Sequence, residues 1–288
     1  MHDFEYIRPK TIADVVNFLD AHGSDTRILA GGTDLLIQLR NNDIQPSFIL
    51  DLKNIPELQA GIQMKNGFVS IGAMVTMSEV IMNPLINKYF PALIDATKVV
   101  GSVQIRNRAT LVGNICNASP AADGAPPLLV YGAEVIAIGS KGTRRIPVNE
   151  FFVQSGVTTL QKREFVASIE LPLPSKRMGA AHVRRTRRRG HDLASVTLCC
   201  GVEETGTVRL CYGSVGPRPV LVVDESGVLA DEKASEEAKA AIFESMFAQA
   251  SPSKKSMRAS PAYRSAMLRV LGRQALELAF SRLNEGEK

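Results

Sequence analysis

A strand-like run that ends in two glycines and leads into a helix constrains this chain more than any other feature. Residues 27–36 read Arg-Ile-Leu-Ala-Gly-Gly-Thr-Asp-Leu-Leu. The first N–H groups of a helix have no partner within the helix, and the helix dipole favours negative charge there. Glycine also lets a ligand approach the main chain without meeting a Cβ atom. The segment is therefore either an ordinary turn or part of a site for phosphate or pyrophosphate.

A second segment, residues 109–124, consists mainly of small and polar residues. It reads Ala-Thr-Leu-Val-Gly-Asn-Ile-Cys-Asn-Ala-Ser-Pro-Ala-Ala-Asp-Gly. This composition predicts a loop, and such a loop can surround a polar ligand with backbone groups and short side chains. An ordinary surface loop would account for Pro120 and Gly124 but leaves the apolar Ile115 and Cys116 unexplained.

The remaining pattern predicts an α+β protein. Strands at 27–30 and 48–52 alternate with helices at 11–19 and 35–40, which is typical of parallel pairing. An Asn-Gly turn favours a hairpin over 62–71. Further helices are expected at 77–82 and 91–100, and further strands at 135–138, 144–148 and 165–171. Two prolines near residue 175 mark a boundary, and beyond it we expect antiparallel strands at 180–185, 194–203 and 208–215, then helices at 235–250 and 260–283.

The two segments together resemble the FAD-binding subunits of the molybdenum hydroxylases, a family that includes xanthine, carbon monoxide and nicotinate dehydrogenases. The resemblance is greatest to the xanthine dehydrogenase type and extends over nearly the whole chain, including residues 104–107, 213–219 and 258–264. One departure is visible. Val112 stands where the family usually has the first glycine of a Gly-Gly-Asn loop.

The resemblance implies a two-lobed FAD-binding domain of the vanillyl-alcohol-oxidase (PCMH-like) type over residues 1–175. Its subdomains are expected at about 1–57 and 58–175. A C-terminal flavoprotein domain is expected over 176–288, and the pattern of strands predicts a three-stranded antiparallel sheet with helices there.

The resemblance also implies which residues bind FAD. Gly31, Gly32 and Thr33 are expected to donate N–H groups to the pyrophosphate, and residues 109–114 to form the opposite wall. We expect valine at position 32 to empty the site while the fold stays mostly intact. In full, the implied cofactor-binding residues are Arg27, Ile28, Leu29, Ala30, Gly31, Gly32, Thr33, Asp34, Ala109, Thr110, Leu111, Val112, Gly113, Asn114, Asp123, Phe165 and Arg184.

Three of these residues have alternative interpretations. Asp123 is expected to pair with hydroxyl or N–H groups of the cofactor, or else to form a helix cap or an Asx-turn. Phe165 belongs either to the cofactor site or to the core of a strand. Arg184 belongs either to the site or to a solvated face.

Five arginines within residues 184–189 form the strongest charge feature of the chain. Arginine binds phosphate through two parallel hydrogen bonds. The run could bind a flavin or nicotinamide dinucleotide, an acidic partner subunit or nucleic acid, or it could be an exposed strand end. It contains no aromatic residue, which argues against single-strand binding by base stacking.

No motif in the sequence predicts an acid, base or nucleophile for substrate chemistry. His191 and Asp192 are adjacent and are interpreted as structural, because neighbours on a strand point to opposite faces. The four cysteines lack the spacing for an iron–sulfur cluster, so no metal is expected on this chain. The hard chemistry is therefore expected to belong to the cofactor.

By resemblance, this chain carries FAD and takes electrons from the 2Fe–2S clusters of a small subunit, while a large subunit carries molybdopterin. FAD would pass the electrons to NAD or another acceptor. The chain has 288 residues, and its 22% of charged residues is ordinary for a globular protein. No apolar run is long enough to cross a membrane, no signal peptide is recognised, and reduced cysteines favour the cytoplasm.

Two alternatives remain open. The first is a stand-alone flavin oxidoreductase of the same fold, which would bind its own organic substrate. The second follows from the net charge of +5, and is a basic anion-binding or nucleic-acid-binding protein without flavin.

Overall fold

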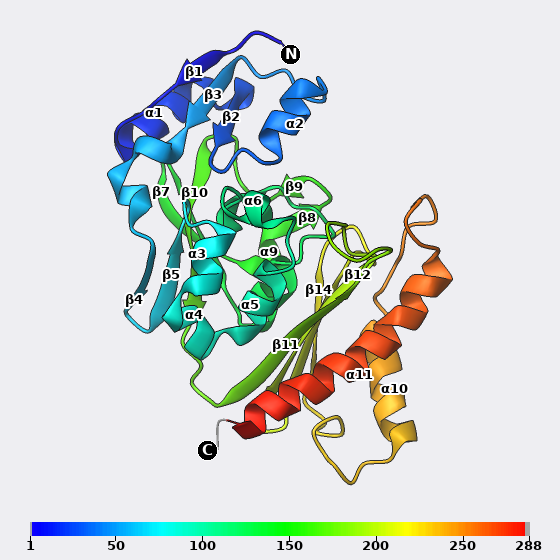
Figure 1. Cartoon of the computed structure of the whole chain (residues 1–288). Coiled ribbons are helices and arrows are strands. Elements are labelled where there is room, and N and C mark those ends of the chain that lie inside the picture. Colours follow the sequence, from blue (N-terminus) through cyan, green and yellow to red (C-terminus); the bar gives the residue numbers. More distant parts are fainter. Residues whose placement is uncertain (1, 286–288) are drawn as a thin grey trace.

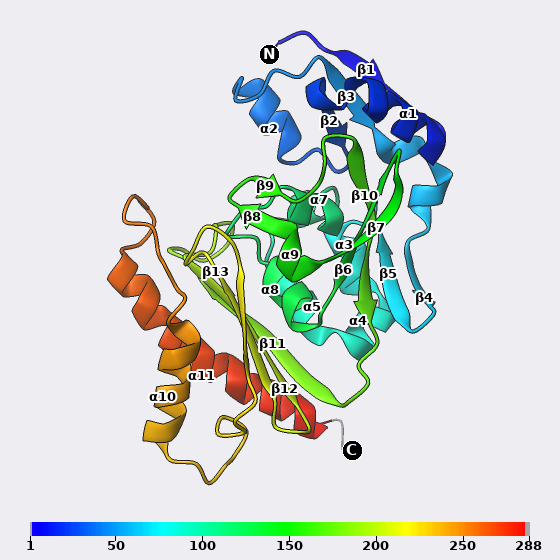
Figure 2. The same cartoon turned by 180° about the vertical axis from the view of Figure 1, so that it is seen from behind.

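Three sheets and one small hairpin organise the chain, of which the computed structural model describes residues 2–285. A small parallel sheet at the N-terminus lies above a five-stranded antiparallel sheet, and a four-stranded antiparallel sheet carries the C-terminal helices (Figures 1 and 2). The expected α+β class is confirmed. Among residues 2–285, no helix is both long and apolar enough to span a bilayer.

The N-terminal lobe has the strand order β1-β3-β2. The predicted parallel pairing of β2 with β3 is confirmed, and β1, which was not predicted, also pairs in parallel with β3. Thr11 and Asp14 form a capping box at the start of α1, so two of the unpaired N–H groups of that helix gain partners. The elements are β1 (Glu5–Ile7), α1 (Ile12–His22), η1 (Gly23–Asp25), β2 (Thr26–Leu29), α2 (Leu35–Arg40), β3 (Phe48–Asp51), η2 (Leu52–Asn54) and η3 (Pro56–Gln59).

The second lobe has the strand order β4-β5-β10-β6-β7. Asn66 and Gly67 both have positive φ, so the hairpin between β4 and β5 has the turn that its sequence predicts. Helices α3 to α8 connect β5 to β6 (Figure 1). The elements are β4 (Ile62–Lys65), β5 (Phe68–Gly72), α3 (Met77–Met82), α4 (Pro84–Tyr89), α5 (Pro91–Thr97), α6 (Val103–Arg106), α7 (Leu111–Cys116), α8 (Ala125–Val130), β6 (Glu134–Gly139), β7 (Gly142–Pro147), α9 (Val148–Phe151), β8 (Phe152–Gln154), β9 (Val157–Thr158) and β10 (Glu164–Pro172).

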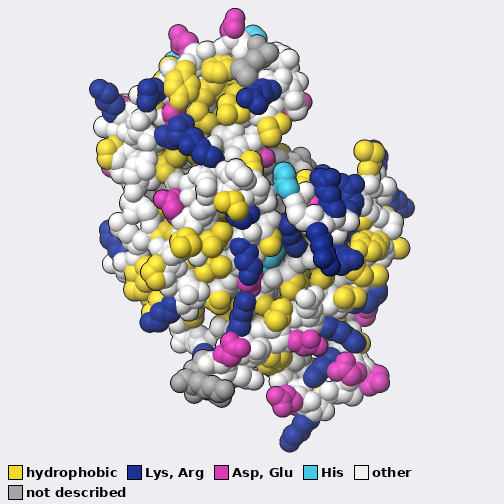
Figure 3. Space-filling model, viewed as in Figure 1, with side chains coloured by type: hydrophobic (Ala, Val, Ile, Leu, Met, Phe, Trp, Pro, Cys, Tyr) yellow, Lys and Arg dark blue, Asp and Glu magenta, His cyan; other side chains and the backbone are white. Residues whose placement is uncertain are grey.

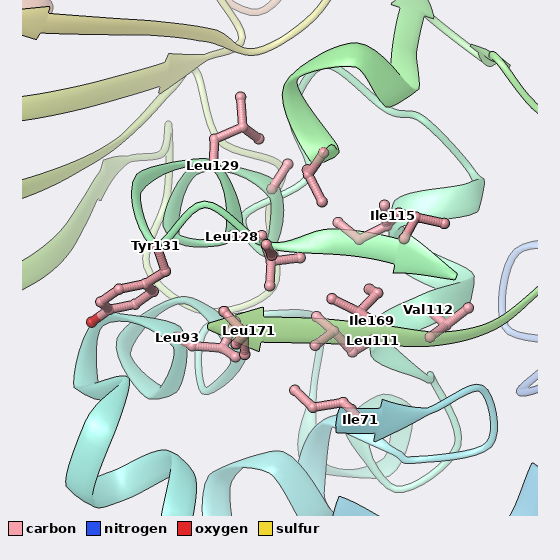
Figure 4. Close-up of a cluster of buried hydrophobic side chains, with 14 of the residues drawn as sticks. Ile71, Leu93, Leu111, Val112, Ile115, Leu128, Leu129, Tyr131, Ile169 and Leu171 are labelled. Carbon is pink, nitrogen blue, oxygen red and sulfur yellow. The ribbon is translucent and has the colours of Figure 1, made fainter. Parts of the chain in front are cut away.

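The prediction of a loop over residues 109–124 was wrong for its first half, which forms helix α7. The Thr110 hydroxyl accepts a hydrogen bond from the Gly113 N–H at 3.0 Å and caps this helix. Leu111 and Ile115 project from α7 into the core formed with Ile71 and Ile169 of the sheet (Figure 4). The apolar residues in the middle of the segment are therefore core residues.

The C-terminal sheet has four strands in the order β11-β12-β13-β14, where we predicted three. The missed strand β14 follows Pro219 and is only partly buried, although residues 220–223 form an apolar run. Helix α11 packs on β11 and β12, whereas α8 contacts the same sheet from the side of the second lobe. Both faces of β12 are consequently buried, which explains its continuous apolar sequence. The elements are β11 (Met178–Arg185), β12 (Val196–Glu203), β13 (Val208–Gly213), β14 (Val220–Asp224), α10 (Glu236–Phe247) and α11 (Pro261–Glu285).

A buried carboxylate joins the second lobe to the C-terminal sheet and helix. Asp95 of α5 accepts a hydrogen bond from Arg282 of α11 at 2.6 Å and pairs with Lys98 at 2.8 Å. Arg282 also donates to the carbonyl of Ala180 in β11 at 2.7 Å. Burial disfavours the Asp95 charge, but the hydrogen bonds from Arg282 and Lys98 outweigh it and lower the pKa of Asp95. The ion pair therefore contributes to stability where Asp95 is ionised.

Asp95→Asn should lower the free energy of unfolding at neutral pH by about 2 kcal/mol, because Arg282 then loses a charged hydrogen-bond partner in a largely buried place. The folded-state pKa lies below the unfolded value, so the contribution of Asp95 is complete above about pH 4 and is lost as the pH falls further. Urea unfolding followed by circular dichroism between neutral and acidic pH measures both effects.

The matched control for this prediction is Asp20→Asn, which removes an exposed carboxylate paired with Arg163. It should change stability little, since an exposed pair is screened by solvent. An Asp95→Asn protein with wild-type stability at neutral pH would show that the contact does not hold the lobes together.

Candidate functional site

A cleft of about 1010 Å³ opens between the N-terminal lobe, the second lobe and one end of the C-terminal sheet. Its volume is at the upper end of the range of roughly 300–1,000 Å³ for ligand pockets. In Figure 3 the surface is hollowed below the N-terminal lobe, and Lys and Arg side chains gather on one side of the hollow.

The first wall is the turn between β2 and α2. The backbone N–H groups of residues 31–34 donate to no other group of the described chain. Gly31 packs directly against the second lobe, because a Cβ atom on it would lie 2.1 Å from the carbonyl oxygen of Arg108. Gly32 has a φ of +78°, a conformation that side chains disfavour. The turn thus presents free donors to the cleft and is held there by a contact between backbones.

The second wall is the start of α7 and the turn that follows it. The side-chain oxygen Oδ1 of Asn114 is buried and has no hydrogen-bond partner within residues 2–285. Val112 lines the cleft and is also buried in the core of the second lobe, so its larger side chain is accommodated by packing. A buried acceptor without a donor is costly, so Asn114 is suited to a ligand that carries a hydroxyl or N–H group.

Asp123 lies in a buried network that ties the second lobe to the C-terminal sheet. One carboxylate oxygen accepts from Arg184 at 2.7 Å, and the other accepts from the hydroxyl of Thr197 at 2.9 Å. His182 lies beneath it, with Nε2 at 2.7 Å from the Thr197 hydroxyl. Arg184 is therefore a partly buried ion-pair partner and not a solvated residue. Asp123 fixes the cleft-lining Arg184, and both of its oxygens already have protein partners.

The third wall is the segment that joins β11 to β12. His191, Asp192 and Leu193 line the cleft there. Burial disfavours the Asp192 charge, but the N–H group and the guanidinium of Arg187 lower its pKa, and Arg258 approaches the same carboxylate at 3.2 Å. Because His191 is exposed and Asp192 is buried with other partners, the two do not act as a pair.

Most of the residues expected to bind a cofactor line this one cleft. Leu29 and Leu111 do not, because both side chains are buried in hydrophobic cores behind the walls. Phe165 is buried but reaches the cleft floor. The residues that do line it are Arg27, Ile28, Ala30, Gly31, Gly32, Thr33, Asp34, Ala109, Thr110, Val112, Gly113, Asn114, Asp123, Phe165 and Arg184.

Sequence reasoning missed several lining residues. They come from helices and strands as well as from the connections around the cleft, and no local signal distinguishes a residue that lines the cleft from its neighbours. The neighbouring pairs and stretches among them include Ile37 and Gln38, Asp43 and Ile44, Val100 and Gly101, Cys116 and Asn117, Ala121 and Ala122, and residues 191–193. Within residues 2–285, no group of His, Cys, Asp or Glu side chains converges as a metal site would require.

Two family profiles together match almost the whole chain. The profile described as the FAD binding domain in molybdopterin dehydrogenase matches residues 2–174. The profile described as the CO dehydrogenase flavoprotein C-terminal domain matches residues 181–279. The chain therefore belongs to the family of FAD-binding subunits of molybdopterin-dependent dehydrogenases.

Individual proteins agree with this assignment. The xanthine dehydrogenase FAD-binding subunit of Escherichia coli O157:H7 is 30% identical over 285 residues, which covers 97% of both chains. A chain of the carbon monoxide dehydrogenase structure from Hydrogenophaga pseudoflava superposes with a TM-score of 0.88 at 29% identity, covering 97% of this chain and 98% of that one. A chain of quinoline 2-oxidoreductase from Pseudomonas putida 86 gives a TM-score of 0.85 at 26% identity and covers 96% of each chain.

The residues of the cleft fit FAD. Free N–H groups along residues 31–34 match the acceptor oxygens of a pyrophosphate. The unpaired Oδ1 of Asn114 matches a donor on the cofactor. Ile105, Val112 and Leu160 add apolar surface of the kind that a flavin ring contacts.

The structure changes how the turn should be tested. A Cβ atom on Gly32 would lie 3.0 Å from Leu29 Cδ1 and 3.5 Å from Leu36 Cδ1, in a left-handed conformation. Valine there would strain the turn and press on neighbouring side chains, so Gly32→Val would not separate an effect on the site from an effect on the fold. Alanine is the smaller change.

Gly32→Ala should raise the dissociation constant for FAD about tenfold, because a left-handed alanine costs roughly 1–2 kcal/mol and the turn relaxes away from its ligand-binding form. Gly61→Ala is the matched control, since Gly61 has a φ of +71° but lies outside the cleft. Both variants should lose similar stability in urea. Equal FAD affinity in the two variants, measured by fluorescence titration of the apoproteins, would remove the turn from the cofactor site.

Proposed function

We propose that this chain is the electron-transfer subunit of a xanthine-dehydrogenase-type molybdenum hydroxylase and that NAD⁺ is its acceptor. In this proposal FAD takes electrons from the 2Fe–2S clusters of a small partner subunit, and a large partner subunit holds molybdopterin. The observation that carries the proposal is the cleft with free N–H groups along residues 31–34, together with the 30% identity to a xanthine dehydrogenase FAD-binding subunit over nearly the full length. When bound, FAD supplies the redox chemistry of the subunit.

The chain's own residues would bind and orient this cofactor. Residues 31–34 would hold the pyrophosphate, and Asn114 would meet a hydroxyl or N–H group of the cofactor. The Asp123–Arg184 ion pair would keep the guanidinium of Arg184 at a constant position in the cleft. The proposal also includes a division at residue 175, with subdomains meeting near residue 57, and a cytoplasmic location, which the four free cysteines support.

Because the chain belongs to a family of FAD-binding subunits, the hypothesis of a basic protein without flavin is abandoned. A stand-alone oxidoreductase differs from the proposal in where substrate is oxidised. Two of the carboxylates that line the cleft, Asp123 and Asp192, are engaged in ion pairs and are therefore not free to act as an acid or base.

Purification from the native host should yield a yellow complex with one FAD in this chain and two larger or smaller companion chains. Xanthine should bleach the flavin anaerobically, and NAD⁺ should restore its colour, because electrons pass through this subunit. Absorbance at the flavin band follows both steps.

Ferricyanide, a general one-electron acceptor, is the control for the acceptor step. Reoxidation by ferricyanide but not by NAD⁺ would contradict the acceptor while the electron-transfer role stands. Oxidation of an organic substrate by the isolated chain would contradict the role itself.

A further inference from the structure

A buried histidine lies behind one wall of the cleft. His182 belongs to β11, which is packed between α5 and α11 (Figure 1). Its side chain is 1% exposed and does not line the cleft, whereas Arg184, two residues further along the strand, does line it. Side chains two positions apart on a strand point to the same face of a sheet. His182 is therefore the inner neighbour of an arginine that faces the cofactor cleft.

Hydrogen bonds connect His182 to Arg184 in a fixed order. Asp123 is paired with Arg184, and its Oδ1 accepts the one proton of the Thr197 hydroxyl at 2.9 Å. The Thr197 oxygen therefore accepts from the His182 ring, whose Nε2 lies 2.7 Å away. Because a hydroxyl has a single proton to donate, Nε2 of His182 must carry a proton of its own. His182 thus orients the hydroxyl that holds Asp123, and Asp123 holds Arg184.

The charges around His182 are balanced while its ring is neutral. The groups that face it from the neighbouring elements are Asp123 with Arg184, Asp95 with Arg282 and Lys98, and the thiol of Cys199 opposite it in β12. Each of the two carboxylates has an arginine at 2.7 Å or less. Burial raises the pKa of the thiol well above its usual value, so the thiol is uncharged. A second proton on the ring would add a buried positive charge that none of these groups balances, and such a charge needs an anion nearby.

We propose that His182 is a positioning residue for FAD, which holds Arg184 in place through Thr197 and Asp123 and takes up a proton when FAD binds. The pyrophosphate of FAD brings two negative charges into the cleft that Arg184 lines, and these charges balance the added proton. The proton comes from solvent and adds to Nδ1, because Nε2 already carries one. The inference rests on the proposed function in one respect, that FAD occupies the cleft. By linkage, FAD then binds more tightly as the pH falls.

Calorimetric titration of the full-length apoprotein with FAD, in buffers that differ in ionisation enthalpy, counts the protons taken up on binding. The wild type should take up a fraction of one proton between about pH 8 and about pH 6, the range in which imidazole gains its charge. The dissociation constant for FAD should fall about threefold per pH unit on acidification, which is below the limit of about tenfold for one linked proton. A histidine with a purely structural role would give neither result.

Two substitutions at position 182 separate the hydrogen bond from the proton. His182→Gln keeps an N–H donor for Thr197 but binds no additional proton. It should bind FAD like the wild type at about pH 8, but more weakly than the wild type at about pH 6, and without proton uptake. His182→Leu also removes the donor, so its dissociation constant should exceed that of His182→Gln about fivefold at both pH values.

The matched control is His22→Gln, which removes an exposed histidine outside the cleft. It should keep the affinity and the proton uptake of the wild type. Thr197→Val interrupts the hydrogen-bond chain while His182 stays in place, and it tests the chain even if His182→Gln does not fold. It should weaken FAD binding at both pH values, because Oδ1 of Asp123 then loses its hydroxyl donor.

The possible outcomes separate this inference from the proposed function. If the wild type binds FAD equally well at both pH values and takes up no proton, the inference fails while the proposed function stands. Proton uptake that persists in His182→Gln also overturns it, and loss of uptake in His191→Gln would assign the proton to that exposed histidine of the cleft. Wild-type affinity in Thr197→Val would remove the hydrogen-bond chain from the site. If the wild type binds no FAD at either pH value, the proposed function fails together with the inference.

Discussion

The contact between Gly31 and the carbonyl of Arg108 is the constraint on which the cofactor site depends. The gap between these two backbones cannot admit even a methyl group, because a Cβ atom on Gly31 would overlap the oxygen at 2.1 Å. The N-terminal turn is consequently pressed against the second lobe just before α7 begins. Free N–H groups on one side of the cleft and the unpaired Asn114 on the other are brought together by this contact. Gly31, which the sequence predicts to let a ligand approach the main chain, therefore also lets the two lobes make contact.

The C-terminal domain supports the cleft from outside through a chain of buried polar contacts. Arg264 of α11 is 5% exposed and donates to the carbonyls of Ser195 and Ser214. Ser214 is left-handed and donates its N–H to the carbonyl of Pro120, in the turn that bears Asp123. The segments 213–219 and 258–264, which carry part of the family resemblance, therefore act on the site by positioning the turn between α7 and α8.

Elements with strong local signals could be predicted, and those defined by their neighbours could not. The Asn66-Gly67 turn and the capped α1 follow from residues a few positions apart. Helix α7 was not predicted, because glycine and asparagine interrupt its apolar pattern. It is stabilised by packing against Ile169 and the neighbouring core residues. Strand β14 is an exception, since the apolar run over residues 220–223 is itself a local signal for a strand.

The same division holds for the site. The glycine turn carried its own signal, and family resemblance supplied the opposite wall. The lining residues Val100, Gly101 and His191 had no signal, because their place in the cleft depends on how three distant segments meet. Leu29 and Leu111 show the converse, since a correctly predicted segment does not say which of its side chains faces the ligand. Alternation along a strand settles that question only when the buried face is known.

Two carboxylates explain why the arginines of one run differ in how they are paired. Asp123 binds Arg184 inside the cleft, where the pair is largely sheltered from water and its geometry is constant. Asp192 anchors the backbone and side chain of Arg187, three residues further on, and shapes the turn around Gly190. Beyond these two anchors no carboxylate of the described chain reaches Arg188 or Arg189. Within five residues the arginines therefore change from ion-paired to unpaired, and this change occurs at the rim of the cleft. Charge that stabilised only the fold would be expected to be neutralised throughout, as it is at Asp95 and Arg282.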